Sequence, residues 1–319
     1  MMIAWVLGSG GLLGAALCRT LRDQGAQLYH PVERFCWDRT PELIPQMTAA
    51  VTAFSAQTVV SDRWEIYWAA GIGTMSSPED VLAPETRAIT LLFELLHANA
   101  RLMDMPGAVA FASSAGAIYA ASSDAVITEL TPPTPTTAYA REKLKQEELV
   151  RSFVVENPKM SALVARISTL YGPGQANGKQ QGLLVHIARC ILRNRPIQIY
   201  VPYDTIRDYV AADDAANLMV TTLRANNKQA RLLTKIIASE YPTTIAEIVS
   251  IFKRIARRAP QIVTSANRQS ALYTRRIQFR SIVLPKCAGI PTKSLLIGIA
   301  QLMAAERAAF VRGAGVEAR

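Results

Sequence analysis

The chain has 319 residues, of which 50% are hydrophobic and 19% charged, a composition typical of a globular protein and not of a disordered one. Lys and Arg number 35 against 25 Asp and Glu, a formal net charge of +10 that is compatible with nucleic acid, an anionic membrane surface or a phosphorylated ligand. The basic residues are dispersed, and no apolar run reaches the roughly 20 residues that span a bilayer. We therefore expect no nucleic-acid and no membrane partner. An ordinary basic surface and a site for a diphosphate both remain open.

The four cysteines are widely scattered, without a Cys-x-x-Cys pair or a histidine at metal-ligand spacing. We expect reduced thiols, a cytoplasmic protein and no metal site. The apolar start, residues 1–17, lacks the basic segment of a signal peptide and carries glycines at a fixed spacing, so we interpret it as folded structure.

The first half alternates short β-like runs with helical patterns. Strands are expected at 3–7, 27–30, 65–69, 108–112 and 162–167, and helices at 12–24, 87–98 and 138–155. Such alternation predicts a mostly parallel sheet covered by helices on both faces.

The pattern loosens after residue 167. Helices are expected at 183–193, from 213, at 245–257 and at 293–312, with strands at 197–201, 206–210 and 232–238. The predicted fold class is α/β: a Rossmann-type doubly wound parallel sheet with a smaller C-terminal α/β substrate lobe. The expected domains are 1–170, which binds NAD(P), and 171–319, which binds substrate, with segments near 206–239 returning to the sheet.

Glycines follow the first predicted strand at a spacing of three, as Gly8, Gly11 and Gly14. The first permits a tight turn, the second lets the backbone approach a pyrophosphate, and the third allows close packing of helix on strand. The helix N-terminus then offers free N–H groups to the phosphates. This context favours dinucleotide binding over an accidental glycine turn.

The loop after the second predicted strand carries Glu33 and Arg34. Glu33 is placed to accept from the ribose hydroxyls of NAD, and Arg34 to pair with the 2′-phosphate of NADP. Both could equally be exposed loop charges, so NAD and NADP stay open.

Tyr139 and Lys143 are four residues apart and share one face of a predicted helix, downstream of the pair Ser113 and Ser114 at the end of a predicted strand. A tyrosine of ordinary pKa near 10 is a poor base, and we expect the ammonium of Lys143, with a positive nicotinamide, to lower the pKa of Tyr139. Tyr-x-x-x-Lys alone is common on helix surfaces. Here the glycine turn and the serine pair favour a catalytic set.

These segments together resemble the extended short-chain dehydrogenase/reductases, the NAD-dependent epimerase/dehydratase group, which acts mostly on nucleotide sugars. The resemblance runs from residue 3 to about 214. It rests on Gly8-x-x-Gly11-x-x-Gly14, Trp68-Ala-Ala-Gly71, Ser113-Ser114-Ala-Gly-Ala-Ile-Tyr119, Tyr139-x-x-x-Lys143, Arg166-Ile-Ser-Thr-Leu-Tyr171-Gly-Pro-Gly-Gln175 and Arg207-Asp-Tyr-Val-Ala-Ala-Asp213-Asp214. Residues 240–319 match loosely.

The resemblance implies a role for each matching residue. Tyr139 is the expected general acid/base, Lys143 holds the nicotinamide ribose, and Ser114 polarises the substrate, with Ser113 as the alternative. The further cofactor contacts implied are Gly8, Gly11, Leu12, Gly14, Ala69, Ala70 and Gly71, and the further substrate contacts are Thr169 and Arg207.

The chain also departs from the family pattern. Dehydratases show Thr-Asp-Glu where this chain has Ser114-Ala115-Gly116, so elimination of water by the usual route is not expected. Thr169 stands where many relatives have asparagine, and another frequent asparagine is replaced at Glu85 or Thr86.

The expected function is NAD(P)-dependent hydride transfer at a sugar carbon of a nucleotide sugar, as an epimerase or oxidoreductase. The alternatives are an NADPH-dependent 4-ketoreductase acting on a deoxysugar or other carbonyl, and a catalytically idle dinucleotide-binding protein. The resemblance also implies a homodimer built through helices 87–98 and 138–155. The pair Glu147 and Glu148 is expected on the surface, and arginines 268, 275, 276 and 280 either include a phosphate ligand or form a solvated face.

Overall fold

The computed structural model describes residues 2–174, 182–226, 231–257, 260–264, 276–284 and 292–317. Within these ranges the strands form one sheet of six strands, one of three and one of two. None of the helices described there combines the length and the apolar content needed to cross a membrane.

The six-stranded sheet is parallel in every pairing. Its strands are, in spatial order, β2 (Gln27–Tyr29), β1 (Met2–Leu7), β3 (Arg63–Trp68), β4 (Gly107–Ser114), β5 (Met160–Ile167) and β9 (Leu232–Ile237). The inner strands are nearly continuous apolar runs, because helices cover both of their faces. The predicted α/β fold class, a Rossmann-type parallel sheet, is confirmed.

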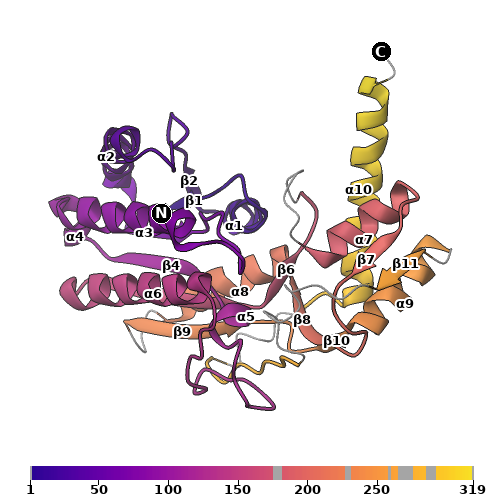
Figure 1. Cartoon of the computed structure of the whole chain (residues 1–319). Helices are drawn as coiled ribbons and strands as arrows, with labels where there is room; N and C mark the ends of the chain where they lie inside the picture. Colours follow the sequence, from indigo (N-terminus) through magenta and orange to yellow (C-terminus); the bar gives the residue numbers. More distant parts are fainter. Residues whose placement is uncertain are drawn as a thin grey trace.

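Helices from the N-terminal half cover one face of this sheet (Figure 1). They are α2 (Thr40–Gln57), α3 (Glu79–His97) and α6 (Ala138–Glu156), and the short helices of this half are η1 (Thr58–Val60), α4 (Ala100–Asp104) and α5 (Ala115–Ile118). The other face is covered by α1 (Leu12–Asp23) and α8 (Ala212–Ala225), which pack against each other. Two apolar cores therefore lie on either side of the strands.

Two helices of the first half differ from expectation. No element was predicted over α2, although Leu43, Met47, Val51 and Phe54 give it a buried stripe at helical spacing. The helix expected from residue 87 begins at Glu79, directly after Pro78, and two acidic residues favour its first turn.

The remaining elements form a second lobe around a third apolar core. One small sheet contains β6 (Thr169–Tyr171), β8 (Ile206–Ala211) and β10 (Pro242–Thr244), and the other contains β7 (Ile197–Ile199) and β11 (Ile262–Thr264). The helices are α7 (Leu183–Leu192), α9 (Ile245–Ala256) and α10 (Leu295–Glu317), and the far end of α10 points away from the rest of the molecule (Figure 1). Of the segments expected to return to the large sheet, β9 pairs with β5, whereas β8 lies in the three-stranded sheet.

Candidate active site

A glycine turn joins β1 to α1. Gly8 has a φ of +85°, and a Cβ added to it would lie 2.6 Å from the backbone carbon of Ala69. A Cβ on Gly14 would lie 2.1 Å from the carbonyl oxygen of Gly8, so neither position has room for a side chain. Gly11 caps α1 without a side-chain hydrogen bond, which leaves N–H groups of the first helical turn for a ligand. The turn therefore fits the diphosphate of a dinucleotide.

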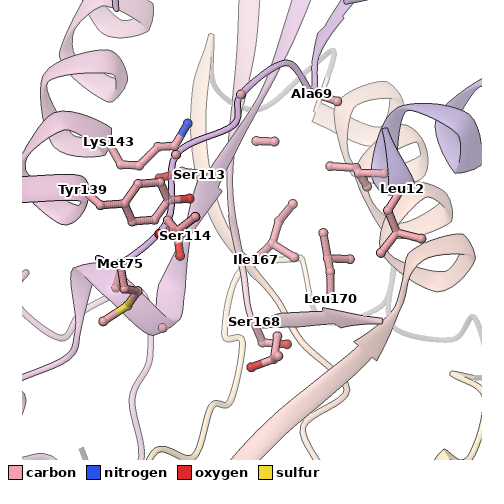
Figure 2. A pocket seen from close by; sticks show the side chains of 18 of the residues that line it. Leu12, Ala69, Met75, Ser113, Ser114, Tyr139, Lys143, Ile167, Ser168 and Leu170 are labelled. Atoms are coloured by element: carbon pink, nitrogen blue, oxygen red, sulfur yellow. The ribbon is translucent and has the colours of Figure 1, made fainter. Parts of the chain in front are cut away.

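A cavity of about 460 Å³ opens beside this turn, at the C-terminal ends of β1, β3, β4 and β5 (Figure 2). Ligands bind in such sheets at the C-terminal ends of the strands, next to the point where the strand order reverses, here between β1 and β3. The predicted residues that line the cavity are Gly11, Leu12, Ala69, Ala70, Gly71, Ser113, Ser114, Tyr139, Lys143, Thr169 and Arg207. Glu33 and Arg34 are exposed in the loop after β2 and are not among the lining residues.

Tyr139 lies in the first turn of α6, where Thr137 caps the helix by accepting a hydrogen bond from the N–H of Ala140. Burial and the negative charge of Glu85 raise the pKa of Tyr139 to about 12, while a hydrogen bond with Ser114 acts in the opposite direction. The sequence predicted that Lys143 and a positive nicotinamide together lower this pKa, whereas in the chain alone burial and Glu85 raise it. The Nζ of Lys143 lies 5.7 Å from the centre of the Tyr139 ring, and its charge is drawn elsewhere.

Lys143 is 6% exposed, and burial lowers its pKa against the opposing effect of the acids around it. Its Nζ donates to Oε1 of Gln146 at 2.9 Å and lies 3.8 Å from a carboxylate oxygen of Glu85. The other Glu85 oxygen accepts hydrogen bonds of 2.6 Å from the backbone N–H groups of Ile72 and Gly73. Glu85 thus joins the loop after β3 to α6.

The two serines at the end of β4 have different surroundings. Ser113 is buried at the cavity wall and donates its hydroxyl hydrogen to Oε1 of Glu147 at 2.6 Å. Ser114 is hydrogen-bonded to Tyr139, and its side chain lies beside the Tyr139 hydroxyl in Figure 2. This geometry favours Ser114 as the substrate-polarising hydroxyl.

Glu147 is buried, contrary to the surface position expected for it, whereas Glu148 is exposed. Arg166 donates to both Glu147 oxygens, at 3.0 and 2.7 Å, and to the hydroxyl of Tyr119 at 2.5 Å. Both oxygens of the Glu147 carboxylate therefore accept hydrogen bonds inside the protein. Sequence patterns missed this network because its members come from three separate elements.

The substrate side of the cavity combines polar and apolar groups. Thr169 is exposed to the cavity, and Arg207 donates to the carbonyl oxygen of Ile206 at 2.7 Å. Met75 and Phe279 supply apolar surface that sequence reasoning did not identify. Gln175 and arginines 268 and 275 lie outside the described residues. Arginines 276 and 280 are exposed and do not line the cavity.

A parallel α/β sheet, a dinucleotide-binding turn and a Ser-Tyr-Lys cavity define a class of NAD(P)-binding Rossmann proteins. The model of the NAD dependent epimerase/dehydratase family matches residues 4–233, and the chain belongs to this family. Membership confirms the resemblance seen in the sequence, and with it a dinucleotide cofactor, NAD or NADP.

The individual relatives share low sequence identity with this chain, or match only part of it. Over 122 residues the chain is 30% identical to the dTDP-L-rhamnose 4-epimerase of Burkholderia thailandensis, a match of 38% of this chain and only 33% of that relative. The fold is similar to that of the UDP-glucose 4-epimerase from Thermotoga maritima with UDP-glucose (TM-score 0.78, 19% identity, 97% of this chain and 100% of that one). It is also similar to RMD from Pseudomonas aeruginosa complexed with NADPH (TM-score 0.79, 19% identity, 97% and 100%). At these identities the structures establish the fold.

Proposed function

We propose that the protein moves a hydride at a sugar carbon of a nucleotide-activated sugar, with Tyr139 as the acid/base, and that it acts as an epimerase. One observation carries the proposal. Ser114, Tyr139 and Lys143 form one wall of the cavity, and the residues around the glycine turn, Leu12 and Ala69, form the wall across from it (Figure 2).

Bound NAD(P) supplies the hydride acceptor and, when oxidised, a positive charge. The Tyr139 phenolate accepts the hydroxyl proton of the substrate as the C–H bond beside it is broken. Ser114 donates a hydrogen bond to the same oxygen, and Lys143 holds the nicotinamide ribose. In an epimerase the resulting ketone receives hydride and proton back on its other face, so no cofactor is consumed.

The same cavity does not favour dehydration. Ala115 and Gly116 begin α5 at the position where the dehydratases of the family carry two acids. Neither residue can protonate a leaving hydroxyl. We therefore propose redox chemistry at the sugar ring without elimination.

The first experiment identifies the dinucleotide released from the denatured, purified protein by mass. Tightly held NAD supports an epimerase, and UDP- and dTDP-sugars are then screened for inversion without net NADH formation. Net consumption of NADPH with a keto substrate supports the 4-ketoreductase instead. Binding of neither dinucleotide contradicts both proposals.

The variant Tyr139→Phe tests the acid/base assignment. Loss of a positioned proton-transfer group costs about 10²- to 10⁴-fold in kcat. We expect this loss with unchanged dinucleotide binding. Full turnover by a folded Tyr139→Phe protein contradicts the assignment. If the wild-type protein turns over none of the sugars, the result supports the alternative of a catalytically idle dinucleotide-binding protein.

We also propose a homodimer formed through α3 and α6. These helices pack side by side, and Leu91, Leu95 and Leu149 remain only partly buried on them. Light scattering should give twice the chain mass of 34.8 kDa, and Leu95→Glu should reduce it to that mass. A wild-type protein that scatters as a monomer contradicts this proposal.

A further inference from the structure

Glu85 is a buried acid at the centre of the candidate site that the proposed mechanism does not use. Its side chain is 10% exposed and lines the cavity from α3, opposite the catalytic helix α6. It is one of the two residues, Glu85 and Thr86, at which the sequence resemblance implies replacement of a frequent asparagine. Its carboxylate lies beside Lys143 and acts on Tyr139, the two residues proposed to bind the ribose and move the proton.

The two carboxylate oxygens of Glu85 have separate partners. Oε1 accepts both backbone hydrogen bonds, from Ile72 and Gly73, each at 2.6 Å. Oε2 faces Nζ of Lys143 at 3.8 Å. The first oxygen therefore fixes the loop after β3, while the second brings a negative charge to the lysine.

The other acids near Lys143 have cations of their own. Glu142, also on α6, binds Lys145 at 3.0 Å, and Glu147 is held by both donor groups of Arg166. Among the three acids that raise the pKa of Lys143, Glu85 has the largest effect, and Glu147 and Glu142 add smaller ones. The negative charge of Glu85 therefore offsets part of the effect that the ammonium would otherwise have on Tyr139.

We propose that Glu85 is a positioning residue of this active site, whose carboxylate holds loop 71–73, partly neutralises Lys143 and thereby moves proton acceptance by Tyr139 to higher pH. This inference rests on the proposed function, because it assigns Glu85 a role toward the Tyr139 proton. The groups that face Tyr139 are Glu85 from α3, Lys143 from α6 and Ser114 from the end of β4. The sign of the Glu85 contribution is fixed, since an anion disfavours a phenolate.

The test is a pH titration of the Tyr139 phenolate by ultraviolet difference absorbance, in protein saturated with NAD⁺ and corrected with the matching Tyr139→Phe protein. Glu85→Gln keeps an oxygen for the two backbone N–H groups but removes the charge. We expect the Tyr139 transition to move to lower pH by about one unit. An unchanged transition in a folded Glu85→Gln protein overturns the proposal.

A matched pair of variants separates charge from loop position. Glu85→Asp and Glu85→Asn are equally short and disturb the loop alike, but only the aspartate keeps the charge. We expect Tyr139 to titrate at lower pH in Glu85→Asn than in Glu85→Asp. Equal Tyr139 titrations in these two variants overturn the proposal even if Glu85→Gln fails to fold.

Glu79→Gln is the control for charge alone. Glu79 lies on the same helix, is 72% exposed and pairs loosely with Arg141 at 3.7 Å. Tyr139 should titrate in the Glu79→Gln protein as it does in the wild type. A shift of the Tyr139 transition equal to that in Glu85→Gln overturns the specific role of Glu85. No sugar turnover is needed for these measurements, so failure of this inference is distinct from the loss of activity that tests the proposed function.

Discussion

Ser113 and Ser114 are adjacent in sequence, and we predict that their alanine variants fail in different ways. Ser113 is 5% exposed and donates a 2.6 Å hydrogen bond to the carboxylate of Glu147. A hydrogen bond to a charged group contributes about 1.5–3 kcal/mol. Ser113→Ala should therefore lower the free energy of unfolding by about 2 kcal/mol and leave hydride transfer nearly intact.

We predict that the Ser114 variant, in contrast, loses activity and keeps its stability. Ser114 lines the cavity and is hydrogen-bonded to Tyr139, and we have proposed that its hydroxyl donates to the substrate oxygen on which charge develops. Removing one such donor costs about 10²- to 10³-fold in kcat. Ser114→Ala should lose activity to that extent while its free energy of unfolding changes by less than about 1 kcal/mol.

The assay for the pair is urea unfolding followed by tryptophan fluorescence, together with kcat on the sugar that the screen identifies. Both variants are measured in one buffer with the wild type as reference. The assignment of Ser114 is refuted if Ser113→Ala is the inactive, stable protein and Ser114→Ala the active, destabilised one.

Three further predictions concern the turn, the second lobe and pH. Gly8→Ala should abolish NAD retention, because its Cβ would lie 2.6 Å from the backbone of Ala69; retained NAD in the purified variant would argue against the turn as the diphosphate site. Gly298→Ala places a Cβ 1.9 Å from the Tyr171 hydroxyl and should cost about 1–3 kcal/mol in urea unfolding, which an unchanged midpoint would disprove. Because the pKa of Tyr139 is raised to about 12, its phenolate is scarce at neutral pH, and kcat/KM for substrate oxidation should rise about tenfold per pH unit below that pKa. A profile that is level between about pH 6 and 9 would contradict this.

The parts of the fold that the sequence predicted depend on short-range patterns. The strands of the large sheet are apolar runs between turn residues, and the glycine turn follows the first of them directly. Tyr139 and Lys143 were recognised because a spacing of four places them on one helix face. These features need no knowledge of tertiary contacts.

The parts that were missed depend on less regular patterns. The stripe of α2 was present in the sequence, but Pro41 and Pro45 interrupt a segment rich in threonine and alanine. Strands β6, β10 and β11, of three residues each, were not predicted either.

Long-range pairing explains the missed site residues. Glu85 acquires its role only because α3 packs against α6, which brings its carboxylate to Lys143. The sequence alone predicts a surface position for Glu147. In the structure, β5 brings Arg166, 19 residues further along the chain, into hydrogen-bonding contact with it. Phe279 reaches the cavity because the backbone of the 276–284 segment pairs with Ile127.

The large sheet is completed late in synthesis. β5 pairs with β9 through six residue positions, from Ala162 with Leu232 to Ile167 with Ile237, so the last strand of the sheet is made some 70 residues after its neighbour. Until β9 leaves the ribosome, β5 is a buried-type apolar strand with a free edge, the kind of surface that recruits other chains. A nascent chain that stalls between these strands should therefore need chaperone protection.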